Sequence, residues 1–281
     1  MKKTEKFRRV GLVANPGKTA GRAVLRQVAE AVGASGRTVQ AEAATAEFGG
    51  LSVPTQPSAL KLARAVDLLI VVGGDGTFLG VARDVAGARA SMIGVNVGRL
   101  GFLTTIPPRR IAESLERIWA GEFRSEQRPL IEVTAPTVNA GRPVLAMNDF
   151  VVARGSGSRL IELAVRVNGC DLTQYRCDGL IVSSPTGSTA YSLAAGGAIV
   201  SPDAEVFVLT PICPHTLTNR PVILNLNSSI EILARSANLE TCLSADGILV
   251  GRVECGDAVQ IRRSGKCVRL LHLEGDTFFV P

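Results

Sequence analysis

The sequence has few aromatic residues, and its charge is nearly balanced. Phe, Trp and Tyr make up 4% of the 281 residues, so aromatic platforms on which single-stranded bases could stack are scarce. The 31 Lys and Arg against 25 Asp and Glu leave a net charge of +6, spread along the chain. This pattern suits an anionic small-molecule substrate, and we expect no nucleic-acid partner.

Metal-binding clusters, membrane spans and secretion signals are also missing from the sequence. Its six Cys form no C-x-x-C pair and only two His could join them, so no zinc site is expected. No apolar run approaches the roughly 18 residues of a membrane-spanning helix. The basic segment Met1–Lys6 is not followed by the apolar core of a signal peptide. We therefore expect a cytoplasmic protein with reduced thiols and no membrane partner.

The most informative stretch of the chain is 67–79. Five branched aliphatic residues, Leu68 to Val72, are typical of a strand buried on both faces, as in the centre of a parallel sheet. Three glycines follow in a tight turn, and helical spacing of apolar residues begins at Thr77. A helix N-terminus behind a glycine turn favours an anion, so we predict a phosphate cradle. Its phosphate-binding residues are Gly73, Gly74, Gly76 and Thr77.

Asp75 lies inside this cradle and adds negative charge where phosphates would bind. A base, or a group beside a metal ion that acts on a nearby hydroxyl, explains it better than phosphate binding does. The alternative is a carboxylate that braces the turn by accepting backbone N–H bonds. Two other glycine motifs fail by spacing: Leu79 replaces the third glycine of a dinucleotide-binding motif, and Gly17-Lys18-Thr19 lies one residue too far from Gly11 for a P-loop.

The pattern of elements divides the chain into two domains. Strands alternate with helices up to the helix predicted over 111–119, which indicates an α/β domain, Rossmann-like with a mostly parallel sheet, over residues 1–125. Alternating strands dominate afterwards, with an Asn168-Gly169 hairpin signal, so we predict an all-β domain, a β-sandwich, over residues 126–271. We expect residues 272–281 to form a C-terminal tail that can return to the first domain. A loop is predicted over 49–58.

Three polar clusters interrupt the second half. The first is Asn148-Asp149, set in an apolar run, where a cap or bulge is the alternative to a ligand site. The second is the segment 177–197, in which a buried strand leads into small and hydroxylic residues; it suits close approach to a ligand with hydroxyl and phosphate groups, or a flexible loop. The third is the proline-rich segment 211–221, whose His215 suits a structural hydrogen bond or catalysis.

These motifs resemble those of the bacterial NAD kinases, the ATP-NAD kinase family, over nearly the whole chain. The Gly-Gly-Asp75-Gly-Thr turn is shared with diacylglycerol kinases, sphingosine kinases and phosphofructokinases, whereas the blocks 178–191 and 211–221 single out NAD kinase. The resemblance implies an α/β domain followed by a β-sandwich. It also implies transfer of the terminal phosphoryl group of ATP to the 2′-hydroxyl of the adenosine ribose of NAD, giving NADP.

The resemblance also implies site residues. Asp75 would accept the proton of the 2′-hydroxyl, Asn148 and Asp149 would bond sugar hydroxyls, and Phe102 would lie against the adenine pocket. Arg159, Arg176 and Asp178 would contact the nicotinamide end or a neighbouring subunit's ligand. The other residues expected to bind NAD are Gly76, Thr186, Thr189, Ala190, Tyr191, Ser192, Leu193 and Ala194.

The same family pattern implies a divalent cation, Mg²⁺, held by phosphates and water without a dedicated protein site, and a homo-oligomer, a dimer or tetramer. Two departures bear on donor preference or affinity: Val97-Gly98-Arg99 replaces an Arg-Gly-Asn sequence, and Asp149 replaces Glu. The sequence leaves open ATP or polyphosphate as donor and NAD or NADH as acceptor. A lipid kinase would need an apolar groove instead of these hydroxylic clusters, and a non-catalytic nucleotide sensor would be expected to lack Asp75.

Overall fold

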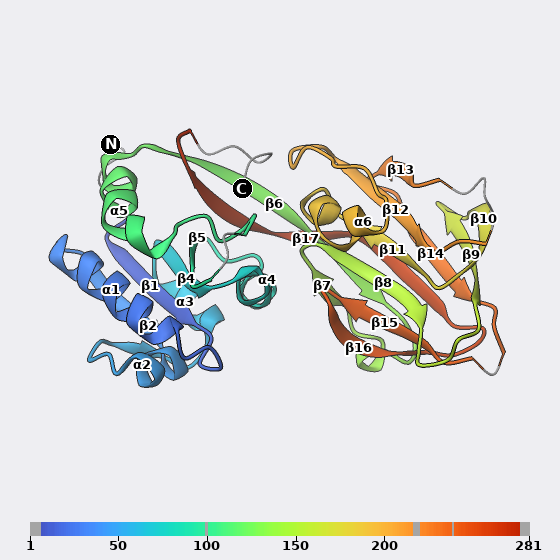
Figure 1. Cartoon of the computed structure of the whole chain (residues 1–281), viewed down its shortest axis with the longest axis horizontal. Coiled ribbons are helices and arrows are strands. Elements are labelled where there is room, and N and C mark those ends of the chain that lie inside the picture. Colours follow the sequence, from blue (N-terminus) through green and yellow to red (C-terminus); the bar gives the residue numbers. More distant parts are fainter. Residues whose placement is uncertain (1–6, 99–100, 216–219, 238, 276–281) are drawn as a thin grey trace. The chain divides into compact units, whose positions relative to one another are not determined.

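The computed structural model describes residues 7–98, 101–215, 220–237 and 239–275. The chain forms two compact units, one of residues 1–128 with 266–281 and the other of residues 129–265 (Figure 1). Both unit boundaries fall inside strands, β6 (Phe123–Thr134) and β17 (Ala258–Leu273). The domain limits expected from the sequence, 125 and 271, stay predictions. Among the described helices, none is long and apolar enough to cross a membrane.

The first unit is built on a parallel sheet with the order β5-β4-β1-β2-β3. All six residues of β4 and of β5 are buried, as the aliphatic runs predict. The end of β17 joins β5 in parallel, Arg269 opposite Ser91. Thr55 and Gln56 correct the loop expected over 49–58, because they pair with β2 as a short strand. The strands are β1 (Arg9–Ala14), β2 (Thr38–Glu42), β3 (Thr55–Gln56), β4 (Leu68–Gly73) and β5 (Ser91–Asn96).

The helices of this unit bury one apolar stripe each. In α1, Leu25, Val28 and Val32 are fully buried at helical spacing, and they share a core with strand residues such as Leu12 and Ile70. Gly121 ends α5 in the left-handed conformation, with φ 86°. The helices are α1 (Gly21–Ala34), α2 (Ala43–Gly49), α3 (Ala59–Ala65), α4 (Asp75–Asp84), α5 (Ile111–Ala120) and the 3₁₀ turn η2 (Pro108–Arg110).

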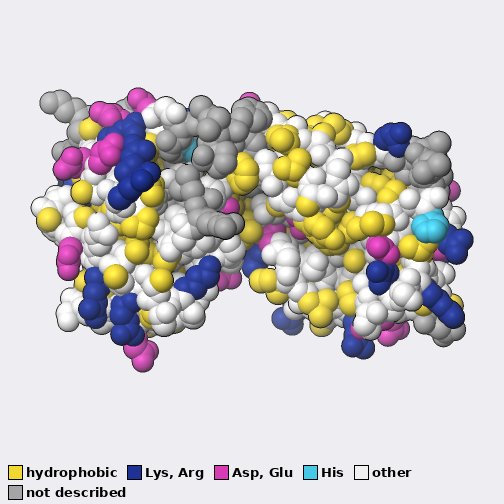
Figure 2. All heavy atoms as spheres, in the orientation of Figure 1, with side chains coloured by type: hydrophobic (Ala, Val, Ile, Leu, Met, Phe, Trp, Pro, Cys, Tyr) yellow, Lys and Arg dark blue, Asp and Glu magenta, His cyan; other side chains and the backbone are white. Residues whose placement is uncertain are grey.

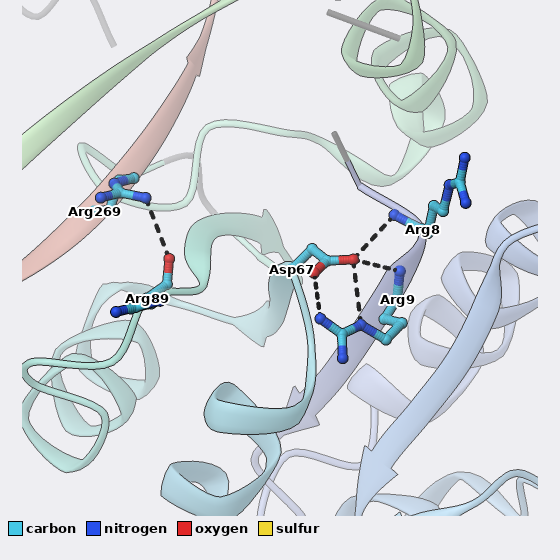
Figure 3. A network of polar contacts seen from close by, with 5 residues as sticks. All are labelled: Arg8, Arg9, Asp67, Arg89 and Arg269. Atoms are coloured by element: carbon cyan, nitrogen blue, oxygen red, sulfur yellow. Dashed lines mark hydrogen bonds and ion pairs between the residues drawn. The ribbon is translucent and has the colours of Figure 1, made fainter. Parts of the chain in front are cut away.

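Asp67, just before β4, fixes the start of β1 (Figure 3). Its carboxylate accepts the backbone N–H groups of Arg8 and Arg9 at 3.1 and 2.9 Å, and it pairs with the Arg9 guanidinium at 2.7 Å. Partial burial works against the charged form, but the bonds from Arg9 prevail and lower the pKa of Asp67. This carboxylate braces the backbone at the other end of β4, which makes it a useful reference for Asp75.

The second unit is a β-sandwich of two antiparallel sheets. Alternate residues face one shared core, for example Phe150 and Val152 from one sheet and Leu163 and Val165 from the other. The predicted hairpin is confirmed: Val167 pairs with Cys170 across Asn168 and Gly169, whose φ angles are 52° and 81°. The fold class expected from the sequence is therefore confirmed for both units.

The strands of the second unit complete the inventory. One sheet has the order β13-β12-β11-β8-β15-β16, and the other contains β10, β9, β14 and the first part of β17, with β6 and β7 beside it. Their bounds are β7 (Val144–Ala146), β8 (Asp149–Arg154), β9 (Ile161–Val167), β10 (Cys170–Cys177), β11 (Gly179–Ser183), β12 (Val206–Ile212), β13 (Val222–Asn225), β14 (Ile230–Ala234), β15 (Thr241–Ala245) and β16 (Ile248–Val253). The short helical segments are η3 (Asn139–Gly141), η4 (Thr186–Thr189) and α6 (Tyr191–Ala194).

Candidate active site

The glycine turn joins the buried strand β4 to the helix α4. Gly74 is the extended residue before the helix, and its carbonyl accepts the N–H groups of Thr77 and Phe78 at 2.9 and 3.1 Å. A side chain at Gly73 would lie 2.7 Å from Thr77 Oγ1, so this position requires glycine. Thr77 Oγ1 is itself buried and has no hydrogen-bond partner among the described residues. The turn thus combines a helix N-terminus with an unused hydroxyl group.

Asp75 is the first residue of α4, and hydrogen bonds hold its carboxylate. Oδ2 accepts the N–H of Phe102 at 2.9 Å, while Oδ1 accepts the N–H and hydroxyl groups of Thr104 at 3.0 and 2.9 Å and the N–H of Leu103 at 3.3 Å. A Cβ at Gly101 would overlap the carboxylate, so glycine permits this approach. The bracing interpretation of Asp75 therefore has direct structural support.

Asn96, at the end of β5, extends this network. Its side-chain amide donates to Thr104 Oγ1 at 2.9 Å, and its Oδ1 accepts the N–H of Gly98 at 2.6 Å. Asn96 is 2% exposed, so the network is fixed from the core side. The turn after β5 and the turn after β4 are thereby coupled through Thr104. Of the expected Val97-Gly98-Arg99 departure, Arg99 lies outside the described residues.

A cavity of about 390 Å³ opens beside Gly74. Lys18 lines it, and a Cβ placed on Gly74 would lie 3.4 Å from Lys18 Nζ. Lys18 follows β1, and β1 pairs with β4 through Ala14 and Val72, so their carboxyl-end loops are neighbours. The sequence around Lys18 does not predict a phosphate site, because its spacing from Gly11 is not that of a P-loop. The feature that could have predicted Lys18 as a site residue is its position in the loop between the parallel strand β1 and the helix α1.

In the second unit, Asn148 and Asp149 lie at the start of β8. Asp246 holds them: its carboxylate accepts the N–H groups of Met147, Asn148 and Asp149 at 3.1, 2.7 and 3.2 Å. Asp149 is 3% exposed, and burial, followed by the charge of Asp246, raises its pKa to about 7. Asn148 Oδ1 is buried without a hydrogen-bond partner among the described residues. Sequence reasoning missed Asp246.

The segment 183–197 packs directly on this pair. The N–H of Ser184 donates to the Asn148 carbonyl at 2.8 Å, and a Cβ at Gly187 would overlap the same carbonyl. Farther along, Ser192 and Thr210 share a buried hydroxyl–hydroxyl bond of 2.8 Å, and Tyr191 is 47% exposed. The structure therefore brings the expected NAD residues from Asn148 to Ala194 into one region: Asn148, Asp149, Thr186, Thr189, Ala190, Tyr191, Ser192, Leu193 and Ala194.

The residues expected at the nicotinamide end are Arg159, Arg176 and Asp178, and the structure gives them different surroundings. Asp178 forms an ion pair of 2.6 Å with Arg154, a residue that the sequence analysis did not single out. Arg159 and Arg176 are exposed. Phe102, which belongs to the first unit, is 37% exposed and donates its backbone N–H to Asp75. The backbone N–H of His215 donates to the Arg176 carbonyl at 2.9 Å.

A parallel α/β unit with a phosphate-binding turn, and a β-sandwich with a cluster of hydroxyl and amide groups, define a phosphotransferase that acts on an alcohol. Comparison with known proteins agrees. The chain matches the ATP-NAD kinase N-terminal domain over residues 10–123 and the ATP-NAD kinase C-terminal domain over residues 147–273. It belongs to the ATP-NAD kinase family.

Individual relatives cover most of the chain. The NAD kinase of Syntrophotalea carbinolica is 43% identical over 76% of this chain and 75% of its own length. That of Moorella thermoacetica is 37% identical over 97% and 87%. This family membership decides against the lipid kinase and the non-catalytic sensor. The activity is transfer of a phosphoryl group from ATP to NAD, giving NADP.

Two solved structures share the fold. The crystal structure of yeast NADH kinase complexed with NADH has a TM-score of 0.86 at 25% identity, covering 97% of this chain and 84% of that chain. The crystal structure of an NAD kinase from Archaeoglobus fulgidus in complex with ATP has a TM-score of 0.74 at 28% identity, covering 95% and 94%. Each of the two ligands, a dinucleotide and a nucleoside triphosphate, is thus bound by a protein of similar fold.

Proposed function

We propose that Asp75 accepts the proton of the adenosine-ribose 2′-hydroxyl of NAD while this oxygen attacks the terminal phosphorus of ATP. A ribose hydroxyl is a poor nucleophile near neutral pH, and a carboxylate within hydrogen-bond reach removes its proton as the bond forms. The observation that supports this role best is the place of Asp75, on the first residue of α4 beside a turn with a free hydroxyl group and a lysine.

The four hydrogen bonds to Asp75 bear on this role. Three of the four donors, at Leu103 and Thr104, bind Oδ1, whereas Oδ2 accepts the Phe102 N–H alone. A carboxylate has about four lone-pair sites, two on each oxygen, so Oδ2 keeps one acceptor site. We therefore expect the substrate hydroxyl to pass its proton to Oδ2 while Oδ1 holds the carboxylate in place.

Lys18 and the glycine turn would hold the phosphates of ATP. The cavity of about 390 Å³ contains Lys18 and Gly74, and the backbone N–H groups at the start of α4 favour an anion. Gly73, Gly74 and Gly76 let phosphate oxygens approach the backbone, and the Thr77 hydroxyl is available as a donor. Positioning and charge neutralisation supply most of the acceleration in phosphoryl transfer.

A divalent cation, Mg²⁺, fits this site as a companion of ATP. Asp75 is the carboxylate at the start of α4 beside this turn. A single carboxylate suits Mg²⁺, which keeps water ligands and binds through substrate phosphates with one or two carboxylates. When bound, the cation would shield the triphosphate charge from Asp75, the carboxylate that would lie beside it.

The residues proposed to bind NAD in the second unit lie in the region where the segment 183–197 packs on Asn148 and Asp149. Asn148 and Asp149 would bond sugar hydroxyls, and Thr189, Ala190 and Tyr191 would hold the adenine end. Thr186, Ser192, Leu193 and Ala194 would complete that wall. In the first unit, Gly76 and Phe102 are the residues proposed to bind NAD. Arg159, Arg176 and Asp178 would contact the nicotinamide end of NAD or the ligand of a neighbouring subunit. The proposal therefore includes a homo-oligomer, a dimer or tetramer, located in the cytoplasm.

One assay tests the proposal. The purified chain is incubated with ATP, Mg²⁺ and NAD, and NADP is detected enzymatically; parallel reactions contain EDTA, polyphosphate in place of ATP, or NADH in place of NAD. We expect NADP with ATP and Mg²⁺ and none with EDTA. Turnover that persists in EDTA would contradict the proposed need for a divalent cation. Sedimentation of an active monomer would contradict the proposed homo-oligomer.

A further inference from the structure

The β15–β16 hairpin holds a carboxylate against the proposed NAD-binding pair. Asp246 and Gly247 form its two-residue loop, with φ angles of 47° and 77°, the conformation that Asp-Gly favours in tight hairpins. The side chain of such a loop residue commonly faces solvent or its own turn. Here it accepts three consecutive N–H groups, from Met147 to Asp149, nearly a hundred residues earlier in the chain.

The return contact makes the arrangement reciprocal. The N–H of Asp246 donates to the Asp149 carbonyl at 3.0 Å. Four hydrogen bonds thus connect one hairpin residue to the backbone that carries Asn148 and Asp149. Three N–H donors on one carboxylate fix the direction of this backbone, and hence of both side chains.

The two side chains so fixed are short of partners. Asn148 Oδ1 is buried without a hydrogen-bond partner among the described residues, and such an atom normally has one from the protein, water or a ligand. Asp149 is 3% exposed, beside a second carboxylate, which disfavours its charged form. An arrangement that leaves an amide oxygen unused and places two carboxyl groups together lowers stability, as binding sites commonly do.

We propose that Asp246 is a positioning residue for NAD: it fixes the Asn148-Asp149 backbone so that the side-chain amide and carboxyl group face the sugar hydroxyls together. The inference rests on the proposed role of Asn148 and Asp149 in NAD binding. Asp246 itself touches the backbone of this pair and acts through it.

The same contact gives the site a pH dependence. Ser183 lies opposite Asp149 on β11, Ala245 on β15 pairs with Phe150, the residue after Asp149, and Asp246 in the hairpin accepts the Asp149 N–H. Asp246 is the titratable member of this set. An ionised carboxylate accepts both hydroxyls of a sugar diol, so NAD binding should strengthen as pH rises through about 7, the pKa of Asp149. Without the charge of Asp246, Asp149 ionises at lower pH.

The test is Asp246→Asn, because Asn tolerates the left-handed φ of this position and keeps one acceptor oxygen. We expect the KM for NAD at pH 8 to rise roughly tenfold with kcat and the KM for ATP nearly unchanged, as expected for lost ground-state binding. We also expect the pH midpoint of the KM for NAD to move below the wild-type value. Asp246→Gly, which keeps the turn and removes all three contacts, should raise the KM further.

The matched control is Asp257→Asn. Asp257 braces the turn between β16 and β17 by accepting the Glu254 N–H at 3.0 Å and the Thr137 hydroxyl at 2.8 Å. Asp257→Asn should change thermal stability without moving the KM for NAD. If Asp246→Asn behaves like this control, with an unchanged KM and pH midpoint, the inference is wrong. Asn148→Ala and Asp149→Asn test separately whether these two residues bind NAD. If neither variant changes the KM for NAD, the proposed NAD-binding role of Asn148 and Asp149 is wrong, independently of Asp246.

Discussion

The two units each hold a carboxylate at the centre of their polar cluster, but in opposite environments. Asp75, at the start of a helix, accepts four hydrogen bonds from Phe102 to Thr104. Asp149 is buried next to Asp246, and burial with that neighbouring charge raises its pKa to about 7. The first environment fixes a carboxylate in place; the second favours one that changes charge near neutral pH.

The two units also differ in their charged and exposed apolar residues. Among the described residues, Phe102 is the exposed large hydrophobic residue of the first unit, whereas the second unit has Leu172, Tyr191, Leu193, Ile199, Ile223, Ile248 and Leu249. Figure 2 shows broad areas of yellow surface on the second unit, at the right, whereas the sequence of the first unit holds 21 of the 31 Lys and Arg residues. A basic surface suits the binding of phosphates, whereas exposed apolar side chains suit contact with the adenine ring of NAD or with another protein surface.

The largest expected effect comes from Asp75→Asn, which keeps the size of the side chain and removes the proton acceptor. If Asp75 is the base, kcat should fall by roughly 10²–10⁴-fold at saturating NAD and ATP, the usual share of general-base catalysis. The matched control is Asp67→Asn, which weakens a bracing carboxylate at the other end of β4. It should lower the melting temperature with activity nearly unchanged. Asp75→Asn activity within threefold of wild type would show that Asp75 only braces the turn.

The second prediction concerns stability and pH. An unfolded Asp titrates near 3.9, but folded Asp149 keeps its proton up to about 7, so the folded state binds more protons between these values and stability falls as pH rises through them. Asp149→Asn lacks this loss. We expect the variant to gain on the order of 2–4 kcal/mol over wild type between pH 4 and 8, measured by thermal melts.

The control for this prediction is Asp171→Asn, because the Asp171 side chain is 84% exposed. Its melting temperature should follow that of wild type across the same pH range. Parallel curves for Asp149→Asn and wild type would contradict a raised pKa at Asp149 and remove the contrast with Asp75.

A smaller effect is expected from Lys18→Met, which removes the cation beside Gly74. The KM for ATP should rise roughly tenfold, as for a lost charge-assisted hydrogen bond to phosphate, with a smaller change in the KM for NAD. Lys18→Arg should restore part of the binding. Lys61→Met, at an exposed position in α3, is the control. Equal changes in both KM values would mean that Lys18 supports the fold instead of binding ATP.

The sequence predicted those features that depend on neighbouring residues in the chain. The strand, glycine turn and helix around Asp75 follow from aliphatic runs, glycines and helical spacing, and the β-sandwich follows from alternation and the Asn168-Gly169 hairpin. The partners of the two carboxylates could not be predicted this way. Thr104 is 29 residues from Asp75, and Asp246 is 97 residues from Asp149. Such contacts depend on which loops the sheets bring together, and an Asp-Gly pair predicts the turn alone.

The smallest effect concerns the exposed aromatic residue of the second unit, Tyr191. Its position at the start of α6, directly after the η4 turn, and its 47% exposure suit contact with the adenine end of NAD. Tyr191→Ala should raise the KM for NAD severalfold and lower kcat less, because stacking acts on bound substrate and transition state alike. Leu172→Ala, at another exposed apolar position of the same unit, should leave the KM for NAD unchanged. An unchanged KM in Tyr191→Ala would take Tyr191 out of the site. It would leave NAD recognition in this unit to the polar groups around Asn148, so that the apolar surface of the second unit would have no part in substrate binding at this residue.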